Sequence, residues 1–213
     1  MKRLSALLLI FVALIVAAPA VSAQFRYAPI VGVTYTDLKF KQDIFPVSNL
    51  VGAQAGVQAE LMFPGIGFGL DFGLIYNMVG AKCDIGSREI WSSNGYRNSD
   101  VRLHTLDIPF HLRFKWTRMN GFEDYLAPFV YGGPDFTLSV GHSKIKGDKG
   151  APKVFDYPTG ELGLTCGGGV EVLRRWQVSV QYTWGMTYII KTSQLENISA
   201  RNRQWAVRVA YMF

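Results

Sequence analysis

Charged residues recur within segments of this 213-residue chain that are otherwise apolar or small. If those segments are extended, the charged side chains share one face and lie inside the folded chain, where buried charges need partners. This pattern indicates a structural network of ion pairs. A proton or ion path would use the same residue types and is the less favoured interpretation. We expect Arg113 and Arg208 each to contact a carboxylate of the set, which comprises Glu60, Asp71, Asp107, Arg113, Lys115, Glu161, Glu171 and Arg208.

Residues for nucleophilic or metal chemistry are scarce. The histidines, His104, His111 and His142, have no recognisable spacing to a serine and a carboxylate, which a hydrolase would need. Cys83 and Cys166 should lie at different heights of the fold, so we expect no disulfide. The sequence contains no glycine-rich phosphate loop, metal-ligand cluster or calcium loop. We therefore predict no catalytic residue, no cofactor and no metal, and a protein that is not an enzyme.

The final ten residues show which element positions the charges. Side chains of a strand alternate between its two faces, so residues 204–213 form a ribbon with one apolar face and one small or polar face. Such a strand is exposed to aggregation at a free edge, but in a membrane barrel its apolar face meets lipid and the first strand covers its edge. The apolar face comprises Trp205, Val207, Val209, Tyr211 and Phe213.

Eight segments with this alternation predict a barrel. The connections between them run long, short, long, short, long, short, long, which is typical of outer-membrane barrels with both termini in the periplasm. We therefore predict an all-β fold: an eight-stranded antiparallel up-and-down transmembrane β-barrel, both termini periplasmic. The expected strands are 30–38, 51–63, 67–79, 102–116, 125–141, 159–173, 176–189 and about 204–213.

A soluble eight-stranded barrel is the alternative, because lipocalin-like folds have the same strand count. Their apolar side chains point inward, whereas here the larger, more aromatic set alternates with glycine, glutamine, threonine and charge. The latter set is too small and polar for a soluble core. The composition therefore favours apolar side chains that face lipid.

Two strands depart from a simple pattern. In the fifth, Phe129 and Tyr131 have the opposite phase to Phe136, and a bulge near Gly132 and Gly133 would let all of them face lipid. In the sixth, the triplet at 167–169 indicates sharp curvature or a close backbone approach rather than a binding loop.

The amino-terminal residues predict export. Lys2 and Arg3 precede an apolar run at 4–18, and the small residues at 21–23 fit cleavage between Ala23 and Gln24. We expect residues 1–23 to be a cleaved signal peptide and residues 24–213 to be the barrel domain. No cysteine follows the cleavage point, so a lipid anchor is not expected.

Charge gives a weak indication of partners. Without Lys2 and Arg3 the formal charge falls from +6 to +4. This mild excess would favour the phosphates of lipopolysaccharide, while the absence of a basic helix or zinc pattern argues against nucleic-acid binding. We expect outer-membrane lipid and lipopolysaccharide as partners.

Several motifs resemble the PorT-like outer-membrane β-barrel family of Bacteroidetes. The similar segments read TLDIPFHL at 105–112, APFVYGGP at 127–134, GGGVE at 167–171 and YTWGM at 182–186. Proline is disfavoured inside a closed sheet, but the resemblance implies that Pro109 belongs in its strand, at a local bulge. The family's founding member takes part in type IX protein secretion, so the resemblance implies a possible accessory role in that apparatus.

The combined interpretation is a non-enzymatic integral protein of the cell outer membrane. Its surface loops would serve recognition or envelope structure. The alternatives are an accessory component of a secretion apparatus, with secretion-system proteins as partners, and a narrow pore. We interpret Phe213, with Tyr211, as an assembly signal for the barrel-assembly machinery.

Overall fold

The computed structural model describes residues 24–40, 46–63, 65, 67–84, 92, 95, 99–143, 155–156, 158–192 and 199–213. The expected signal peptide, including Ala23, lies outside these residues, and Gln24 begins the first strand. Among the described residues, no helix is long and apolar enough to cross a membrane.

Eight antiparallel strands close into a barrel, as predicted, because the last strand, β10, pairs with β1. Each of the other barrel strands pairs with its neighbours along the chain. The barrel strands are β1 (Gln24–Phe40), β2 (Val47–Met62), β3 (Phe68–Cys83), β4 (Ser99–Lys115), β5 (Leu126–His142), β7 (Gly160–Val172), β8 (Trp176–Gly185) and β10 (Ser199–Tyr211).

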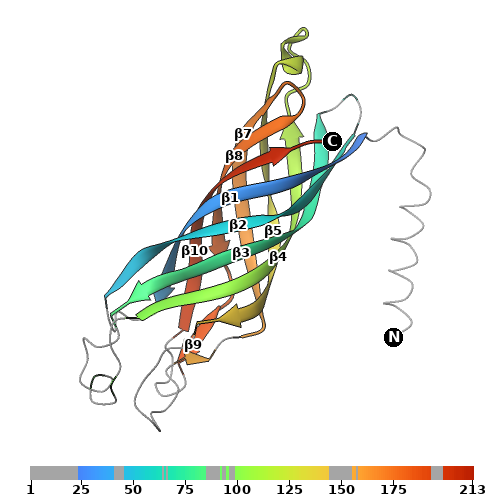
Figure 1. Ribbon diagram of the computed structural model, residues 1–213. Helices are drawn as coiled ribbons and strands as arrows, with labels where there is room; N and C mark the ends of the chain where they lie inside the picture. Colours follow the sequence, from blue (N-terminus) through green and yellow to red (C-terminus); the bar gives the residue numbers. More distant parts are fainter. Residues whose placement is uncertain are drawn as a thin grey trace, which may run out of the picture.

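Short and long connections leave the barrel at opposite ends (Figure 1). The β2–β3, β4–β5 and β7–β8 connections share one end, here called the turn end, with the carboxyl terminus. The other end, the loop end, carries the long connections. Two short strands that the sequence did not predict, β6 (Phe155–Asp156) and β9 (Ile190–Thr192), pair with each other there, and β9 also pairs with β10.

Local sequence explains the turn-end connections. Asn120 and Gly121 both have positive φ, 55° and 90°, which these two residue types adopt most readily, and a 3-10 turn (Phe122–Asp124) follows. Leu173 and Arg174, with φ of 52° and 56°, turn the chain between β7 and β8. Gly65, with φ of 81°, lies in the β2–β3 connection.

The two faces of the sheet have the predicted polarity. On β1, Val31 and Val33 are 61% and 58% exposed, whereas Thr34, the residue after Val33, is fully buried. The same alternation holds on β10, where Trp205 and Val207 point outward and Ala206 and Arg208 point inward. The apolar exterior and polar interior are the arrangement of a barrel in lipid.

The prediction for the fifth strand was wrong. Phe129 and Tyr131 point into the barrel and are 2% and 7% exposed, while Phe136 is 52% exposed on the outside. No bulge occurs at Gly132 and Gly133, since β5 keeps one register with β7 from Leu126 to Leu138. The assumption that every large aromatic residue faces lipid caused this error.

Pro109 is not at a bulge either. The pairs on either side of it, Phe72 with Phe110 and Ile75 with Asp107, share one register between β3 and β4. The register shift of β4 lies instead between His104 and Thr105, opposite β5. The sheet thus accommodates Pro109 by omitting ladder pairs locally, without inserting a residue.

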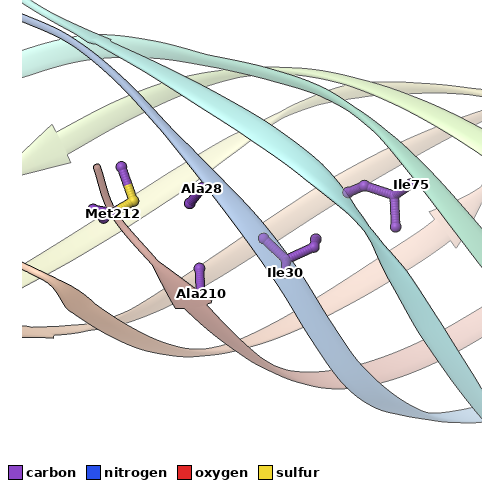
Figure 2. Close-up of a cluster of buried hydrophobic side chains, with 5 residues drawn as sticks. All are labelled: Ala28, Ile30, Ile75, Ala210 and Met212. Atoms are coloured by element: carbon purple, nitrogen blue, oxygen red, sulfur yellow. The ribbon is translucent and has the colours of Figure 1, made fainter.

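Apolar side chains form two groups in the barrel interior. Figure 2 shows the cluster toward the turn end, formed by β1, β3 and the last residues of the chain. It comprises Ala28, Ile30, Ile75, Ala210 and Met212. At the loop end, a second group of inward residues is at most 3% exposed, and it comprises Leu38, Leu50, Val79, Val101 and Leu103.

Candidate functional site

A network of charged side chains crosses the barrel interior near the turn end. We call it the turn-end network, and its residues come from six of the eight barrel strands, so it ties the barrel walls together. The members are Arg26 (β1), Glu60 (β2), Asp71 (β3), Arg113 and Lys115 (β4), Glu171 (β7) and Gln177 (β8).

Glu60 is the centre of this network. Its carboxylate accepts from Arg26 Nη2 at 2.7 Å and from Lys115 Nζ at 2.6 Å. Arg113 Nη1 lies 3.0 Å from the other carboxylate oxygen, and Gln177 Nε2 donates to that oxygen at 2.8 Å. The Glu60 side chain is fully buried, so these donors replace the water that an ionised carboxylate would otherwise bind.

The charges of the network balance. Its three cationic side chains face three carboxylates, because Arg113 Nε also binds Asp71 Oδ2 at 2.7 Å and Glu171 Oε2 binds Arg26 and Lys115 at 2.6 and 2.9 Å. Such an arrangement attracts neither a free anion nor a free cation strongly. The network is therefore a set of ion pairs that links the barrel walls across the interior.

Aromatic side chains lie next to the network on the loop side. Arg113 Cζ lies 4.2 Å from the centre of the Phe129 ring and 5.5 Å from that of Tyr131. The interior position of these two rings, which the sequence interpretation missed, therefore serves the network through cation–π contact. Gly167 supplies the space, because a Cβ there would lie 2.8 Å from the Tyr131 hydroxyl.

The structure brings together only part of the predicted charge set. Arg113 contacts carboxylates as expected, and Glu60, Asp71 and Glu171 lie with it. Arg208 does not: among the described residues it makes no ion pair, and its Nη2 donates to the Tyr131 hydroxyl at 3.0 Å. The Tyr131 ring, wrongly assigned to lipid, occupies the position where we expected a carboxylate.

Asp107 and Glu161 lie in a separate group nearer the loop end. They line a cavity of about 20 Å³ with Asp135, and we call this group the acidic cavity. The Asp107 carboxylate accepts from Asn77 Nδ2 at 2.8 Å and from the Thr105 hydroxyl at 3.0 Å. Oε1 of Glu161, a residue that is 8% exposed, has no hydrogen-bond partner among the described atoms. These two carboxylates therefore lack the cations that surround Glu60.

His111 contacts one residue of the acidic cavity, Asp135. Its Nε2 lies 2.9 Å from Asp135 Oδ1, and the Thr165 hydroxyl donates to the other oxygen of that carboxylate. In a catalytic triad the nucleophilic hydroxyl forms a hydrogen bond with the imidazole, whereas here the Thr165 hydroxyl binds the Asp135 carboxylate and not His111. Within the described residues, no group of three or more His, Cys, Asp or Glu side chains is arranged to hold a metal ion.

A hollow of about 590 Å³ opens at the turn end, and the turn-end network forms its inner wall. Its rim includes Arg118, which donates to the Gly65 carbonyl, and Arg174, which pairs with Asp124. Glu123 lies outside the barrel strands, and backbone hydrogen bonds, including those from Met119 and Gly121, hold its pKa below the usual range. Each of these charged side chains therefore has a hydrogen-bond or ion-pair partner.

Aromatic residues outside the barrel form two groups along its axis. At the turn end, the Phe213 ring stacks on Tyr27 at 5.4 Å and meets Tyr211 at 5.0 Å. At the other end, the Trp205 ring lies 4.7 Å from Tyr182. Eight residues of strand separate Trp205 from Phe213, or about 27 Å along the strand and about 20 Å along a barrel axis at the usual tilt. This spacing suits the apolar band of an outer-membrane barrel.

Cys166 and His104 both point to the outside of the barrel. Cys166 is exposed, in the lipid-facing phase of β7, and both cysteines are free thiols. His104 points outward near the loop end, where its Nδ1 lies 2.6 Å from the Tyr76 hydroxyl. Both therefore lie outside the barrel interior.

Sequence reasoning also missed two charged interior residues. Arg26 precedes the strand that was expected to begin at Ile30, although it has the same inward phase. Asp135 was overlooked although it directly precedes Phe136, which was expected to face lipid and does. The alternation of side chains would have identified both.

Comparison with known proteins identifies the family. Residues 20–191 match the outer membrane protein beta-barrel domain. No curated protein matches the sequence. The outer membrane protein OprG from Pseudomonas aeruginosa has a similar fold, with a TM-score of 0.51 and 12% identity over 90% of this chain and 97% of that chain.

Two further solved structures are similar at lower TM-scores. The attachment invasion locus protein Ail of Yersinia pestis gives a TM-score of 0.44 with 11% identity, over 89% of this chain and 99% of that one. Neisserial surface protein A gives a TM-score of 0.44 with 12% identity, over 86% of this chain and 96% of that one. The match over residues 20–191, together with a closed eight-stranded barrel that is apolar outside and polar inside, shows that this chain belongs to the outer membrane protein beta-barrel domain family.

Proposed function

We propose that this protein is a sealed, non-enzymatic barrel of the outer membrane that displays its long connections at the cell surface for recognition or envelope structure. The observation that carries this proposal is the turn-end network. Its ion-paired side chains from six strands close the interior, and balanced charge gives a passing ion no favourable site. On this proposal, the side chains of the network block the passage of ions through the interior.

Planar-bilayer recording of the purified protein tests the proposal against the narrow-pore alternative. We expect no stepwise conductance at protein concentrations at which a porin, as the positive control, inserts and conducts. Reproducible single-channel steps from the folded protein would refute the sealed interior. A heat-modifiable electrophoretic shift of the same sample would confirm that the protein tested was folded.

The proposed orientation puts the turn end in the periplasm. Gln24 and Phe213 lie at this end, where the Phe213 amide donates to the Tyr27 carbonyl at 2.9 Å. Short connections at the periplasmic end and long ones outside are the rule for bacterial barrels. The outward aromatic residues at the two ends would then lie at the two membrane interfaces.

An accessory role in protein secretion is the second candidate. It is favoured by the resemblance of residues 105–112 and 167–171 to PorT-like barrels, and its partners would bind the periplasmic connections or the lipid-facing strands. Deletion of the gene followed by profiling of exported proteins separates the two roles. Unchanged secretion would remove this candidate, whereas selective loss of exported proteins would favour it over the display role.

A further inference from the structure

A group of basic side chains lies on the outer face of the barrel at the loop end. Lys39 on β1 and Arg201 on β10 are exposed and stand directly opposite each other in the β1–β10 register. Arg203, two residues along β10, points to the same side. We call these three residues the basic rim.

The basic side chains of the rim outnumber the acidic ones beside them. Asp37 is the register partner of Arg203, but none of the three basic residues makes an ion pair within the described part of the chain. Like charges directly opposite each other on paired strands destabilise a sheet. Lys39 and Arg201 are therefore arranged in a way that an external anion would stabilise. The guanidinium of Arg201 lies 5.0 Å from the Tyr188 ring, which restrains its position.

The height of the basic rim matches a lipid headgroup. Tyr35 and Trp205 are register partners in the aromatic group at this end, and Lys39 and Arg201 lie four residues beyond them. Four residues of strand span about 13 Å, or about 10 Å along the barrel axis at the usual tilt. Headgroups extend about 5–7 Å beyond the hydrocarbon core, and long basic side chains bend toward them.

The strand surface below the rim suits the acyl chains of the same lipid. Val33 and Val207 are register partners and are 58% and 50% exposed, and Ala53 on β2 stands next to Val33. These small aliphatic side chains leave a low, apolar path between the aromatic groups at the two ends. A lipid could thus contact cations with its headgroup and this path with its chains.

We propose that Lys39, Arg201 and Arg203 form a binding site for the phosphate groups of a lipid headgroup in the leaflet at the loop end. Arginine pairs with phosphate through two parallel N–H donors, and lysine adds a point charge. The proposal rests on the proposed function, which puts the loop end in the outer leaflet. The lipid would then be a phosphorylated glycolipid of the lipopolysaccharide type.

A second outward basic pair provides a matched control. Lys82 on β3 and Arg102 on β4 are also exposed at the loop end, but Asp100 accompanies them. The Arg102 guanidinium binds the Asp100 carboxylate at 3.0 Å, and Lys82 is the register partner of Asp100. This pair carries its own counter-charge and should contribute little to phosphate binding.

The test titrates the folded protein in detergent micelles with bisphosphorylated lipid A and follows tryptophan fluorescence. A Lys39→Gln, Arg201→Gln, Arg203→Gln triple variant should bind about a hundredfold more weakly, at about fivefold for each cation removed. A Lys82→Gln, Arg102→Gln variant should stay within about twofold of the wild type, since its charges are largely compensated. Dephosphorylated lipid A should bind the wild type as weakly as bisphosphorylated lipid A binds the triple variant.

Three results would each overturn the inference. These are undiminished binding by the triple variant, an equal loss in the control variant, and equal affinity for dephosphorylated lipid A. Competition by inorganic phosphate as effective as by lipid A would show an ion site rather than a lipid site, and would also refute it. A micelle exposes both ends of the barrel to the same lipid, so failure of this test leaves the proposed orientation and sealed interior intact. Heat-modifiable mobility of each variant checks folding.

Discussion

At the scale of single residues, Glu60 illustrates how burial and charge combine. Its carboxylate is fully enclosed, and it is stable there because Arg26, Arg113, Lys115 and Gln177 all reach it. The sequence predicted its inward phase, and it predicted that Arg113 contacts a carboxylate of the charged set without identifying which one. It did not predict Arg26, whose contribution depends on how far β1 extends toward the turn end.

Removing the Glu60 charge should weaken the barrel strongly. Glu60→Ala leaves three cations around a buried gap, and breaking a buried ion pair typically costs about 3–5 kcal/mol. Equilibrium urea unfolding in micelles, followed by tryptophan fluorescence, measures the change in the free energy of unfolding. The exposed Arg102–Asp100 pair is the control, because Asp100→Ala should cost less than about 1 kcal/mol. Equal effects of the two substitutions would contradict the role of the turn-end network.

Glu161 should respond in the opposite direction. Its Oε1 is buried without a partner, and a buried polar atom in this state costs about 1–3 kcal/mol. Glu161→Gln keeps the shape but removes a buried negative charge beside Asp107 and Asp135, so we expect the free energy of unfolding to rise by about 1–3 kcal/mol. Asp71→Asn, which removes a partner of Arg113, should lower stability in the same assay. A destabilised Glu161→Gln variant would show that the carboxylate is satisfied in the folded barrel.

At the scale of elements, strand phase was predictable wherever small and large residues alternate cleanly. β2 and β10 follow the sequence pattern residue by residue. β5 was misread because Phe129 and Tyr131 are large but lie inside, where Gly167, the register partner of Tyr131 on β7, leaves space for the Tyr131 ring. Because the large residue is on β5 and the glycine that makes room for it is on β7, the sequence of β5 alone does not reveal this arrangement. The extension of β1, β3 and β4 into expected loops likewise depends on pairing between strands.

Gly167 should therefore tolerate no side chain while Tyr131 is present. A Cβ at Gly167 would lie 2.8 Å from the Tyr131 hydroxyl and from the Gln181 Cβ, and overpacking of this kind costs about 1–3 kcal/mol. Gly160→Ala on the same strand is the control, since its nearest atoms would be 3.7 Å away. Unfolding in urea should show the loss for Gly167→Ala only, with part of it restored by adding Tyr131→Ala. No restoration in the double variant would exclude the contact as the cause.

At the scale of the whole molecule, closure depends on the first and last strands. β10 pairs with β1 from Ile30 to Phe40, as the alternation of residues 204–213 predicted, and Phe213 packs on Tyr27 beyond the end of that ladder. The sequence could therefore predict the barrel and its strand count. The contacts of the turn-end network could not be predicted in detail, because they depend on which side chains from six strands meet.

Phe213 should matter more for assembly than for stability of the finished barrel. Phe213→Glu puts a charge beside Tyr27 and Tyr211 at the membrane interface and would impair recognition by the assembly machinery, so we expect less folded protein in the outer membrane. The heat-modifiable fraction of isolated membranes measures this level. Phe213→Tyr keeps the ring and should assemble normally. Wild-type levels of the Phe213→Glu protein would refute a role for this residue as an assembly signal.

The central claim, an outer-membrane barrel that displays its long connections outside the cell, is tested most directly by site-specific labelling. Single cysteines at Ser143, beside a long connection, and at Asn120, in the β4–β5 turn, would be introduced with Cys83 and Cys166 replaced by alanine. In intact cells, a membrane-impermeant maleimide should label Ser143→Cys, and it should label Asn120→Cys only after the outer membrane is permeabilised. Labelling of Asn120→Cys but not Ser143→Cys in intact cells would contradict the account.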